Sequence, residues 1–210
     1  MVELIAIITD QSLSLSRGEV LGVVIAYALG CLTTGYYLVR WRTGQDIRAL
    51  GSGNVGARNV HRALGRWGFI ATFLGDFAKG FIAIILARRA EFGPLALLLV
   101  LLAVVAGHNW PVQLGFRGGK GISTSLGAIF GYHLALTAGL VIVFVTLYAF
   151  WRRFTVSGLA AYACAPVIAL VCQSGLLNIL GMTLLAIMVL AAHHQNLRDA
   201  WGELKPAAKT

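Results

Sequence analysis

Charged residues are scarce in this 210-residue sequence, where they make up 12% of all positions and only 8 of them are Asp or Glu. A soluble domain carries about 25% charged residues, so roughly half the polar groups that a water-facing surface needs are missing. Hydrophobic residues reach 58%, and the mean hydropathy is +0.79. The composition excludes an ordinary soluble protein and indicates a single membrane-embedded domain over residues 1–210.

Cysteine is also rare, and the chain contains only Cys31, Cys164 and Cys172. These residues lie in or beside apolar runs and lack both C-x-x-C spacing and a paired framework, which excludes a disulfide scaffold. We interpret them as buried free thiols, and we expect neither a metal nor a cofactor. A basic n-region is missing before the first apolar run. We therefore predict no cleaved signal peptide and a retained span at Val20–Val39.

Long apolar runs predict an all-α, polytopic integral membrane protein with seven transmembrane helices. The predicted spans are 20–39, 67–87, 95–106, 122–130, 133–151, 155–172 and 176–192. The run at 122–130 is short and rich in small residues, so a partly re-entrant helix is an alternative there. A short segment, 1–18, precedes the spans, and a polar tail, 193–210, follows them.

The positions of Lys and Arg predict how the chain is oriented. With seven spans and the N-terminus outside, 13 of the 17 cations lie in cytoplasmic segments, 3 lie outside, and Lys79 lies within a span. Such a bias predicts a cytoplasmic C-terminus. The net charge of +9 would suggest nucleic acid as the partner of a soluble protein. Here the cations flank apolar runs, so we expect contact with anionic membrane lipids and not with nucleic acid.

The segment 51–66 combines glycines with small polar and basic residues. Its first part contains Gly51, Ser52, Gly53, Asn54, Gly56 and Asn59. Arg58, Arg62 and Arg66 recur at four-residue spacing, which predicts three guanidinium groups on one side of a helix. A Gly-rich turn before a helix exposes backbone N–H groups, and Arg binds phosphate bidentately. The segment therefore predicts a phosphate site with Arg62 as its main cation, whereas topology alone explains Arg66.

A second glycine-rich segment, 107–121, contains His108 and the run GGKG at 118–121. It is similar to a Walker A loop, but Leu114 replaces the first glycine of that loop, and a glycine at 121 replaces the Ser or Thr that would bind magnesium. We interpret this segment as a second phosphate-binding loop without nucleotide hydrolysis, in which Lys120 supplies the charge.

Two smaller polar groups lie at the end of the last span and inside the second span. The last span ends in HHQN at 193–196, where His193 and Asn196 share a helix face and His194 is expected to cap helix carbonyls. Asp76 and Lys79 are three residues apart inside a span, where they can neutralise each other. They form either a structural pair or a support for the phosphate site.

These segments resemble the three motifs of the bacterial acyl-phosphate:glycerol-3-phosphate acyltransferases, the PlsY family. The motifs are SGNxGAxNxxR at 52–62, GHxxP with FxGGKG at 107–121, and HxxN at 193–196. The resemblance runs from about Val20 to Arg198, and DxxKG at 76–80 also fits it. It implies a seven-helix enzyme of the bacterial inner membrane whose active site faces the cytoplasm. Such an enzyme transfers a fatty acyl group from acyl phosphate to the sn-1 hydroxyl of glycerol 3-phosphate, which is the first step of phospholipid synthesis and releases lysophosphatidic acid and phosphate.

The resemblance also implies roles for individual residues. The implied catalytic set is Ser52, Arg62, Lys120, His193 and Asn196. The implied phosphate- and substrate-binding set is Gly51, Gly53, Asn54, Gly56, Asn59, His108, Gly118, Gly119, Gly121 and Thr124. The family usually has Thr where Arg58 stands and Arg where His194 stands. The role of Arg58 therefore stays open, and position 194 is not expected to be essential.

Acyl phosphate is already activated, so no covalent enzyme intermediate is required. Either a substrate phosphate oxygen or His193 would accept the hydroxyl proton.

The main alternative function is a membrane transporter for organic phosphates, which predicts a site near the bilayer midplane. A lipid-binding scaffold would leave the glycine patterns unexplained. The sequence gives no indication of a protein partner.

Overall fold

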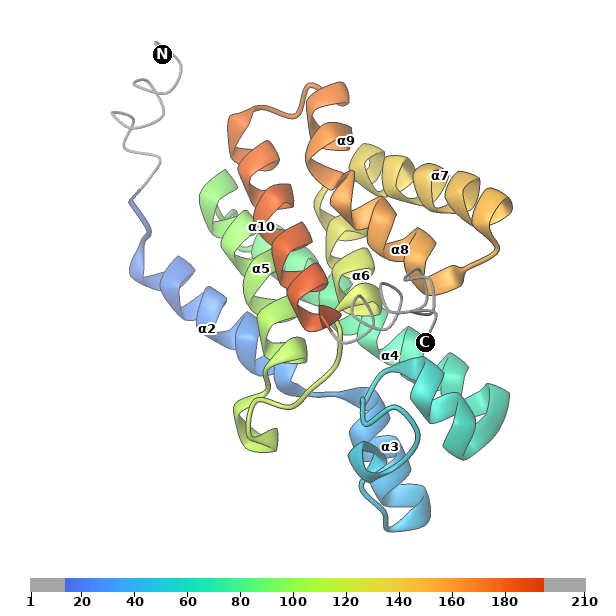
Figure 1. Cartoon of the computed structure of the whole chain (residues 1–210). Helices are drawn as coiled ribbons and strands as arrows, with labels where there is room; N and C mark the ends of the chain where they lie inside the picture. The colour runs from blue at the N-terminus through green and yellow to red at the C-terminus, as the bar shows by residue number, and fades with distance from the viewer. Residues whose placement is uncertain (1–13, 195–210) are drawn as a thin grey trace, which may run out of the picture.

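The computed structural model describes residues 14–194, which form helices and no strand. Figure 1 shows these helices gathered in one bundle, with α5 and α10 side by side and α7 along one edge. In chain order the elements are α2 (Arg17–Cys31), α3 (Thr34–Thr43), the 3-10 turn η2 (Ile47–Ala49), α4 (Ala57–Arg89), α5 (Pro94–Asn109), the 3-10 turn η3 (Val112–Leu114), α6 (Ile122–Tyr132), α7 (Leu134–Trp151), α8 (Phe154–Ala163), α9 (Ala165–Val171) and α10 (Leu176–Ala192).

Several helical segments are long and apolar enough to cross a membrane. Within the described residues, four helical segments are both long enough and hydrophobic enough to cross a bilayer: Arg17–Thr43, Ala57–Arg89, Pro94–Leu114 and Leu134–Trp151. The pair α8 and α9, bent by 50°, would form a fifth span. Within residues 14–194 the prediction of an all-α membrane protein is confirmed. Seven spans and their orientation stay predictions, because α6 has 11 residues and α10 has 17, fewer than the roughly 20 that usually cross a bilayer.

The first predicted span is not one continuous helix, because α2 ends at Cys31 and α3 begins at Thr34. A buried side chain of α4 satisfies the carbonyls that this break exposes: Lys79 Nζ donates to the carbonyls of Gly30 at 3.0 Å and Leu32 at 2.9 Å. The Thr34 N–H on the far side of the break donates to Asp76 Oδ1 at 3.3 Å. The break is stable because the α4 ion pair replaces the missing helical hydrogen bonds.

Two other helices depart from the prediction. Gly65 has φ +68° and ψ −160°, a non-helical conformation that kinks α4. The prediction that Arg66 shares a helix face with Arg58 and Arg62 is therefore wrong, because Arg66 lies beyond the kink. The sixth predicted span bends at the start of α9, where Pro166 lacks an N–H group for the helical ladder.

Glycines let the central helices approach each other closely. A Cβ atom on Gly30 of α2 would overlap the Val104 carbonyl of α5, and one on Gly107 of α5 would overlap the Tyr27 carbonyl of α2. In the same way, a Cβ atom on Gly127 of α6 would overlap the backbone of α4. Small residues allow such contacts in membrane bundles, where packing replaces the hydrophobic effect as the main attraction between helices.

The outer surface of the bundle is apolar, and Ile142, Phe150 and Val171 are more than half exposed. Such side chains are suited to lipid, and this agrees with the membrane prediction. All three cysteines are unpaired, as expected, but only Cys31 is buried.

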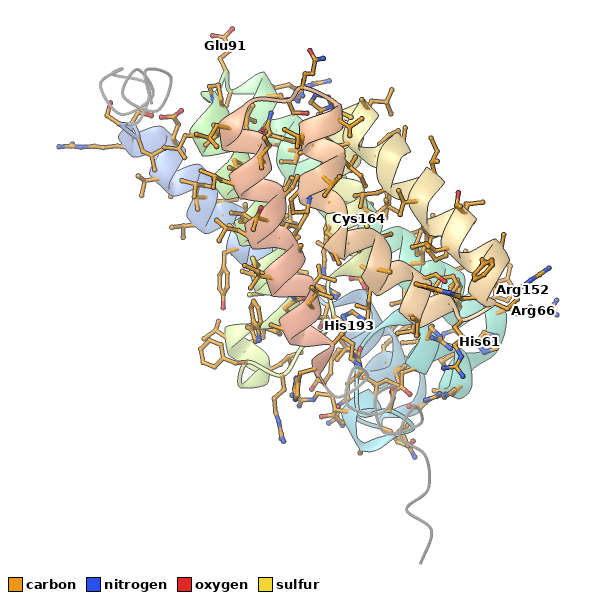
Figure 2. All side chains as sticks on the ribbon, turned by 45° about the horizontal axis from the view of Figure 1, so that its top comes forward. His61, Arg66, Glu91, Arg152, Cys164 and His193 are labelled. Carbon is orange, nitrogen blue, oxygen red and sulfur yellow. The ribbon has the colours of Figure 1, made fainter. Side chains whose placement is uncertain are left out.

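The Glu91 turn lies at one end of the bundle, whereas His193, His61 and Arg66 lie toward the other (Figure 2).

Candidate active site

The first glycine-rich segment is folded by the side chain of Asn59, which is 3% exposed. Its Oδ1 accepts a hydrogen bond from Ser52 N at 2.9 Å, and its Nδ2 donates to the carbonyls of Leu50 and Asn54, each at 2.9 Å. A third contact joins Nδ2 to the carbonyl of Ile47 at 3.2 Å. The amide therefore ties the loop to the first turn of α4 and fixes the position of Ser52.

The N-cap of α4 is Gly56, and no side chain of residues 14–194 caps this end of the helix. Asn54 Oδ1 accepts from Gly56 N at 2.5 Å, which shapes the turn just before the helix. Uncapped N–H groups and the helix dipole attract anions at such an end. Two residues of this first turn, Ala57 and Arg58, line the cavity described below.

The second glycine-rich segment folds back on the end of α5. Gly118 N and Gly119 N donate to the carbonyls of Asn109 and His108 at 3.1 and 2.9 Å. A Cβ atom on Gly119 would overlap the His108 imidazole, so this position requires a glycine. The loop then enters α6 through Gly121, the N-cap, and Lys120 stands directly before that helix.

Arg48 connects the two loops. Its Nη1 donates to the carbonyl of Leu114 at 2.7 Å, and its Nη2 lies 2.7 Å from Asp46 Oδ2. The guanidinium lowers the pKa of the Asp46 carboxyl through hydrogen bonding and charge. This cation stabilises the loops and is not among the residues that line the cavity described below.

A buried polar cluster lies beneath the loops. Lys79 Nζ lies 2.9 Å from both Asp76 Oδ1 and His108 Nδ1, and His108 Nδ1 lies 3.6 Å from Asp76 Oδ1. All three residues are at most 5% exposed. The expected pairing of Asp76 with Lys79 is confirmed, and the structure adds His108 as a third member. The cluster joins the break in the first span to the wall of the cavity, which both Asp76 and His108 line.

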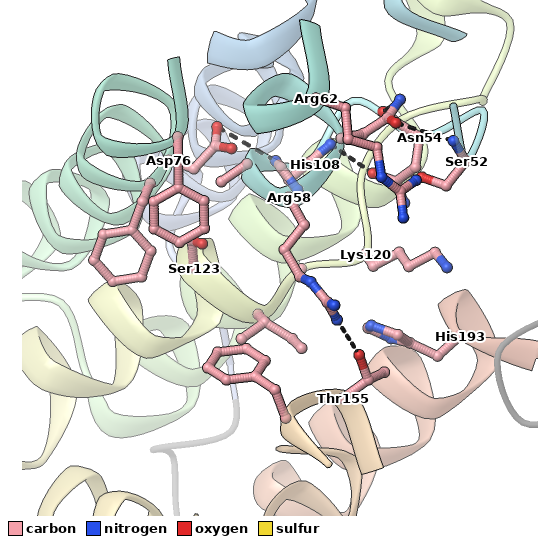
Figure 3. A pocket seen from close by; sticks show the side chains of 18 residues that line it. Ser52, Asn54, Arg58, Arg62, Asp76, His108, Lys120, Ser123, Thr155 and His193 are labelled. Carbon is pink, nitrogen blue, oxygen red and sulfur yellow. Dashed lines mark hydrogen bonds and ion pairs between the residues drawn. The ribbon is translucent and has the colours of Figure 1, made fainter. Parts of the chain in front are cut away.

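A cavity of about 420 Å³ opens between these loops and the cluster (Figure 3). Its lining residues are Ser52, Asn54, Gly56, Ala57, Arg58, Asn59, Arg62, Phe69, Phe73, Asp76, His108, Lys120, Gly121, Ile122, Ser123, Phe154, Thr155 and His193. Three of them are Arg or Lys, and the one carboxylate among these described residues is Asp76, which Lys79 neutralises. The cavity is therefore suited to anions, with an aromatic wall on one side.

His193 lies just after α10 and is 3% exposed. Its Nδ1 lies 2.8 Å from the Val189 carbonyl, which can only accept, so Nδ1 carries the proton and the neutral ring keeps a lone pair on Nε2. The pKa of His193 is lowered to about 4, chiefly because the ring is buried; the Val189 contact opposes this shift, and the positive charge of Lys120 adds to it. A neutral His193 is thus an acceptor near neutral pH. His194 Nδ1 contacts the Ala191 carbonyl at 3.1 Å, as expected for a cap.

Comparisons with known proteins identify the family. A model of the family described as glycerol-3-phosphate acyltransferase matches residues 20–202. The chain belongs to this family. It is 43% identical over 174 residues to glycerol-3-phosphate acyltransferase 1 of Desulfitobacterium hafniense, which covers 83% of this chain and 86% of the relative. It is 40% identical over 182 residues to the Geobacter sulfurreducens glycerol-3-phosphate acyltransferase, covering 86% and 92% of the two chains.

Two solved structures share the acyltransferase fold. One is PlsY, an integral membrane glycerol 3-phosphate acyltransferase, in its glycerol 3-phosphate form, with a TM-score of 0.82 and 30% identity over 92% of this chain and 96% of that one. The other is the lysophosphatidic acid form of PlsY, with a TM-score of 0.79 and 29% identity over 90% and 94%. The sequence resemblance to PlsY is confirmed.

In this acyltransferase the cavity gathers four of the five residues expected to be catalytic. These are Ser52, Arg62, Lys120 and His193. The fifth, Asn196, lies outside the described residues. Among the expected binding residues, the cavity is lined by Asn54, Gly56, Asn59, His108 and Gly121. The other expected binding residues, which do not line it, are Gly51, Gly53, Gly118, Gly119 and Thr124.

The residues that do not line the cavity shape its walls. A Cβ atom on Gly51 would overlap Asn59 Oδ1 and approach Arg62, so a glycine lets the loop close over α4. Thr124 is fully buried, and its carbonyl packs against Gly80 of α4. These positions control the spacing of the acyltransferase loops and helices.

Sequence reasoning missed the aromatic wall and the contribution of α8. Phe69 and Phe73 lie four residues apart on α4, and their rings stack with centroids 6.3 Å apart. Phe154 and Thr155 come from the first turn of α8. The spacing of Phe69 and Phe73 was visible in the sequence, but it does not distinguish a substrate wall from a lipid-facing stripe. Phe154 and Thr155 follow the basic pair 152–153, which is the sequence signal that predicts a position at the same membrane face as the glycine-rich loops.

Proposed function

We propose that this acyltransferase moves a fatty acyl group from acyl phosphate to the sn-1 hydroxyl of glycerol 3-phosphate and releases lysophosphatidic acid and phosphate. One observation carries the proposal: a single cavity combines three cations and an uncapped helix start with an aromatic wall. Two phosphorylated substrates, one of them a lipid, need such a combination. The names of the related proteins support the glycerol 3-phosphate half, and the chemistry of the cavity supports the acyl phosphate half.

The residues of the cavity have distinct roles in this proposal. Arg62 and Lys120 bind phosphate groups, and the α4 N-terminus with Ser52 stabilises developing negative charge. The wall that includes Asn54, Gly56 and Gly121 lets the backbone approach the substrates closely. Holding the acyl carbon and the hydroxyl in contact supplies much of the rate, because the donor is already activated. Asn196 is proposed to join this set.

The proton acceptor is a substrate phosphate oxygen in this proposal. A phosphate monoester has a second pKa of about 6, above the pKa of about 4 for His193 in the unliganded site. His193 Nε2 is then the acceptor that orients the hydroxyl. The variant His193→Ala tests this assignment: a loss of about four decades in kcat with unchanged KM would instead make His193 the base.

We also propose that residues 1–210 act as a single domain with seven spans in a bacterial inner membrane, with the N-terminus outside and the cavity facing the cytoplasm. The asymmetry of the cations supports this topology. Cysteines placed singly in the Glu91 turn and in the Arg117 loop, in a variant that lacks Cys31, Cys164 and Cys172, would test it in spheroplasts. Under the proposal, an impermeant thiol reagent labels only the Glu91 turn, and the reverse pattern would overturn it.

The transporter alternative is not favoured, because the family match and the curated relatives are acyltransferases. The deciding assay incubates the purified protein with palmitoyl phosphate and labelled glycerol 3-phosphate, with palmitoyl-coenzyme A as the control donor. We expect lysophosphatidic acid from palmitoyl phosphate only. In proteoliposomes, uptake of label without acyl transfer would support a transporter instead.

A further inference from the structure

Arg58 crosses the cavity from α4 to α8. It stands on the first turn of α4, and its Nη1 donates a hydrogen bond to Thr155 Oγ1 on the first turn of α8. The guanidinium carbon also lies 5.7 Å from the centre of the Phe154 ring. Both partners are neutral, so these contacts orient the guanidinium without cancelling its charge.

The position of Arg58 differs from that of the other two cations. Phe69, Phe73 and Phe154 form the aromatic wall, and the Arg58 guanidinium stacks on a member of that wall. Arg62 packs against Gly51 of the first glycine-rich loop, and Lys120 reaches the cavity from the second loop, near His193 (Figure 3). Arg58 thus lies at the border between the apolar and the polar halves of the cavity.

A lipid with an anionic head needs a cation at such a border, because its tail must follow the aromatic wall while its phosphate remains among polar groups. Glycerol 3-phosphate has no apolar part and gains nothing from that wall. The border therefore discriminates between the two phosphorylated substrates.

We propose that Arg58 binds the phosphate of the acyl phosphate, and that Thr155 and Phe154 are positioning residues for its guanidinium. The inference rests on the proposed function and assigns the lipid donor to one side of the cavity. Arg62, Lys120 and His193 then hold glycerol 3-phosphate on the other side.

The test uses Arg58→Gln, which keeps a hydrogen-bonding group of similar length and removes the charge. Arg66→Ala is the matched control, because it removes a cation from the same helix outside the cavity. The first readout is binding of a non-hydrolysable palmitoyl phosphonate to the purified protein without glycerol 3-phosphate. The second is the KM for each substrate.

We expect Arg58→Gln to weaken phosphonate binding about ten- to hundredfold, which is the loss of a charge-assisted hydrogen bond. The KM for palmitoyl phosphate should rise in parallel, while the KM for glycerol 3-phosphate stays within about twofold of the control. Arg58→Lys should recover part of the affinity. Thr155→Val should cost about fivefold, because it removes one neutral contact that orients the guanidinium.

Unchanged phosphonate affinity in Arg58→Gln would overturn the inference. If the melting temperature of the same variant were also lowered, the role of Arg58 would be to stabilise the packing of α4 against α8. A rise confined to the KM for glycerol 3-phosphate would also overturn it, by placing Arg58 at the other substrate. Failure of the proposed function looks different, because the unmodified protein would then make no lysophosphatidic acid from palmitoyl phosphate. The phosphonate measurement does not depend on turnover.

Discussion

The kink at Gly65 is expected to control activity more than stability. Gly65 has φ +68° and ψ −160°, a region that is essentially restricted to glycine, and no atom of the described part of the chain lies within 4 Å of the place where a Cβ atom would stand. Gly65→Ala therefore meets no steric clash and introduces only backbone strain, of about 1–3 kcal/mol. The chain can relieve this strain by continuing α4 as a regular helix, because alanine favours helical angles.

Straightening α4 would move the cations of the cavity. Sharp helix kinks exceed about 20°. Arg58 lies seven residues before the kink, or about 10 Å along the axis at 1.5 Å per residue, so removing a kink of about 20° displaces it by about 3–4 Å. Misplacement by about 1 Å can already cost about a hundredfold in rate. We expect Gly65→Ala to lower kcat/KM at least about a hundredfold.

Gly175 provides a matched control for this experiment. It also has positive φ, +79°, with ψ 161° and open space around the missing Cβ, but it lies in the turn before α10. Gly175→Ala should lose a similar 1–3 kcal/mol in unfolding free energy and keep activity within about twofold. The assays are thermal unfolding in detergent and steady-state kinetics with palmitoyl phosphate. Full activity in Gly65→Ala together with reduced stability would refute the reasoning, because α4 would then keep its kink despite the strained backbone at residue 65.

Three further predictions concern the buried pair, the arginines and His193. Lys79→Met should cost about 3–5 kcal/mol in unfolding free energy because it leaves a buried carboxylate unpaired, and Asp76→Asn should restore part of that loss, as a double-mutant cycle by thermal unfolding would show. Arg62→Lys should lower kcat/KM about tenfold or more because it loses bidentate phosphate contacts, whereas Arg66→Ala should stay near wild type in the same assay. The pKa of His193 is lower in the folded protein, at about 4, than the usual 6.5, so its contribution to stability is present above pH 6.5 and is lost as the pH falls toward 4. Unfolding followed against pH should show this loss, and His193→Gln should remove it.

The limits of the helices were predictable where apolar runs end in polar or breaking residues. The last helix, Leu176–Ala192, agrees with the sequence prediction at both ends. The break between Cys31 and Thr34 was not predictable, because it depends on Lys79, whose Nζ hydrogen-bonds to carbonyls 47 and 49 residues earlier in the chain. Gly65 could have been suspected as a breaker, but an isolated glycine in a membrane helix is as often a packing residue as a kink.

The polar half of the candidate site was predictable because charge is rare in this sequence. A cation or a glycine-rich turn between apolar runs is conspicuous, and this led to Ser52, Arg62 and Lys120. The apolar half was not predictable in the same way, since a phenylalanine such as Phe73 suits a core, a lipid face or a substrate wall equally well. Only the fold shows that Phe73 faces the cavity and that α8 completes it.

The buried cluster explains why a membrane enzyme with so few carboxylates places one of them beside an anion site. Asp76 borders the cavity, where a free carboxylate would repel the two phosphorylated substrates that we propose to bind there. The ammonium of Lys79 at 2.9 Å cancels that charge, and the remaining acceptor capacity of Asp76 holds the Thr34 N–H. Lys79 in turn holds the broken end of α2 and contacts His108. The same pair therefore supports the break in the first span and the position of His108 at the cavity wall, and the neutralised carboxylate leaves the positive charge of the cavity uncancelled.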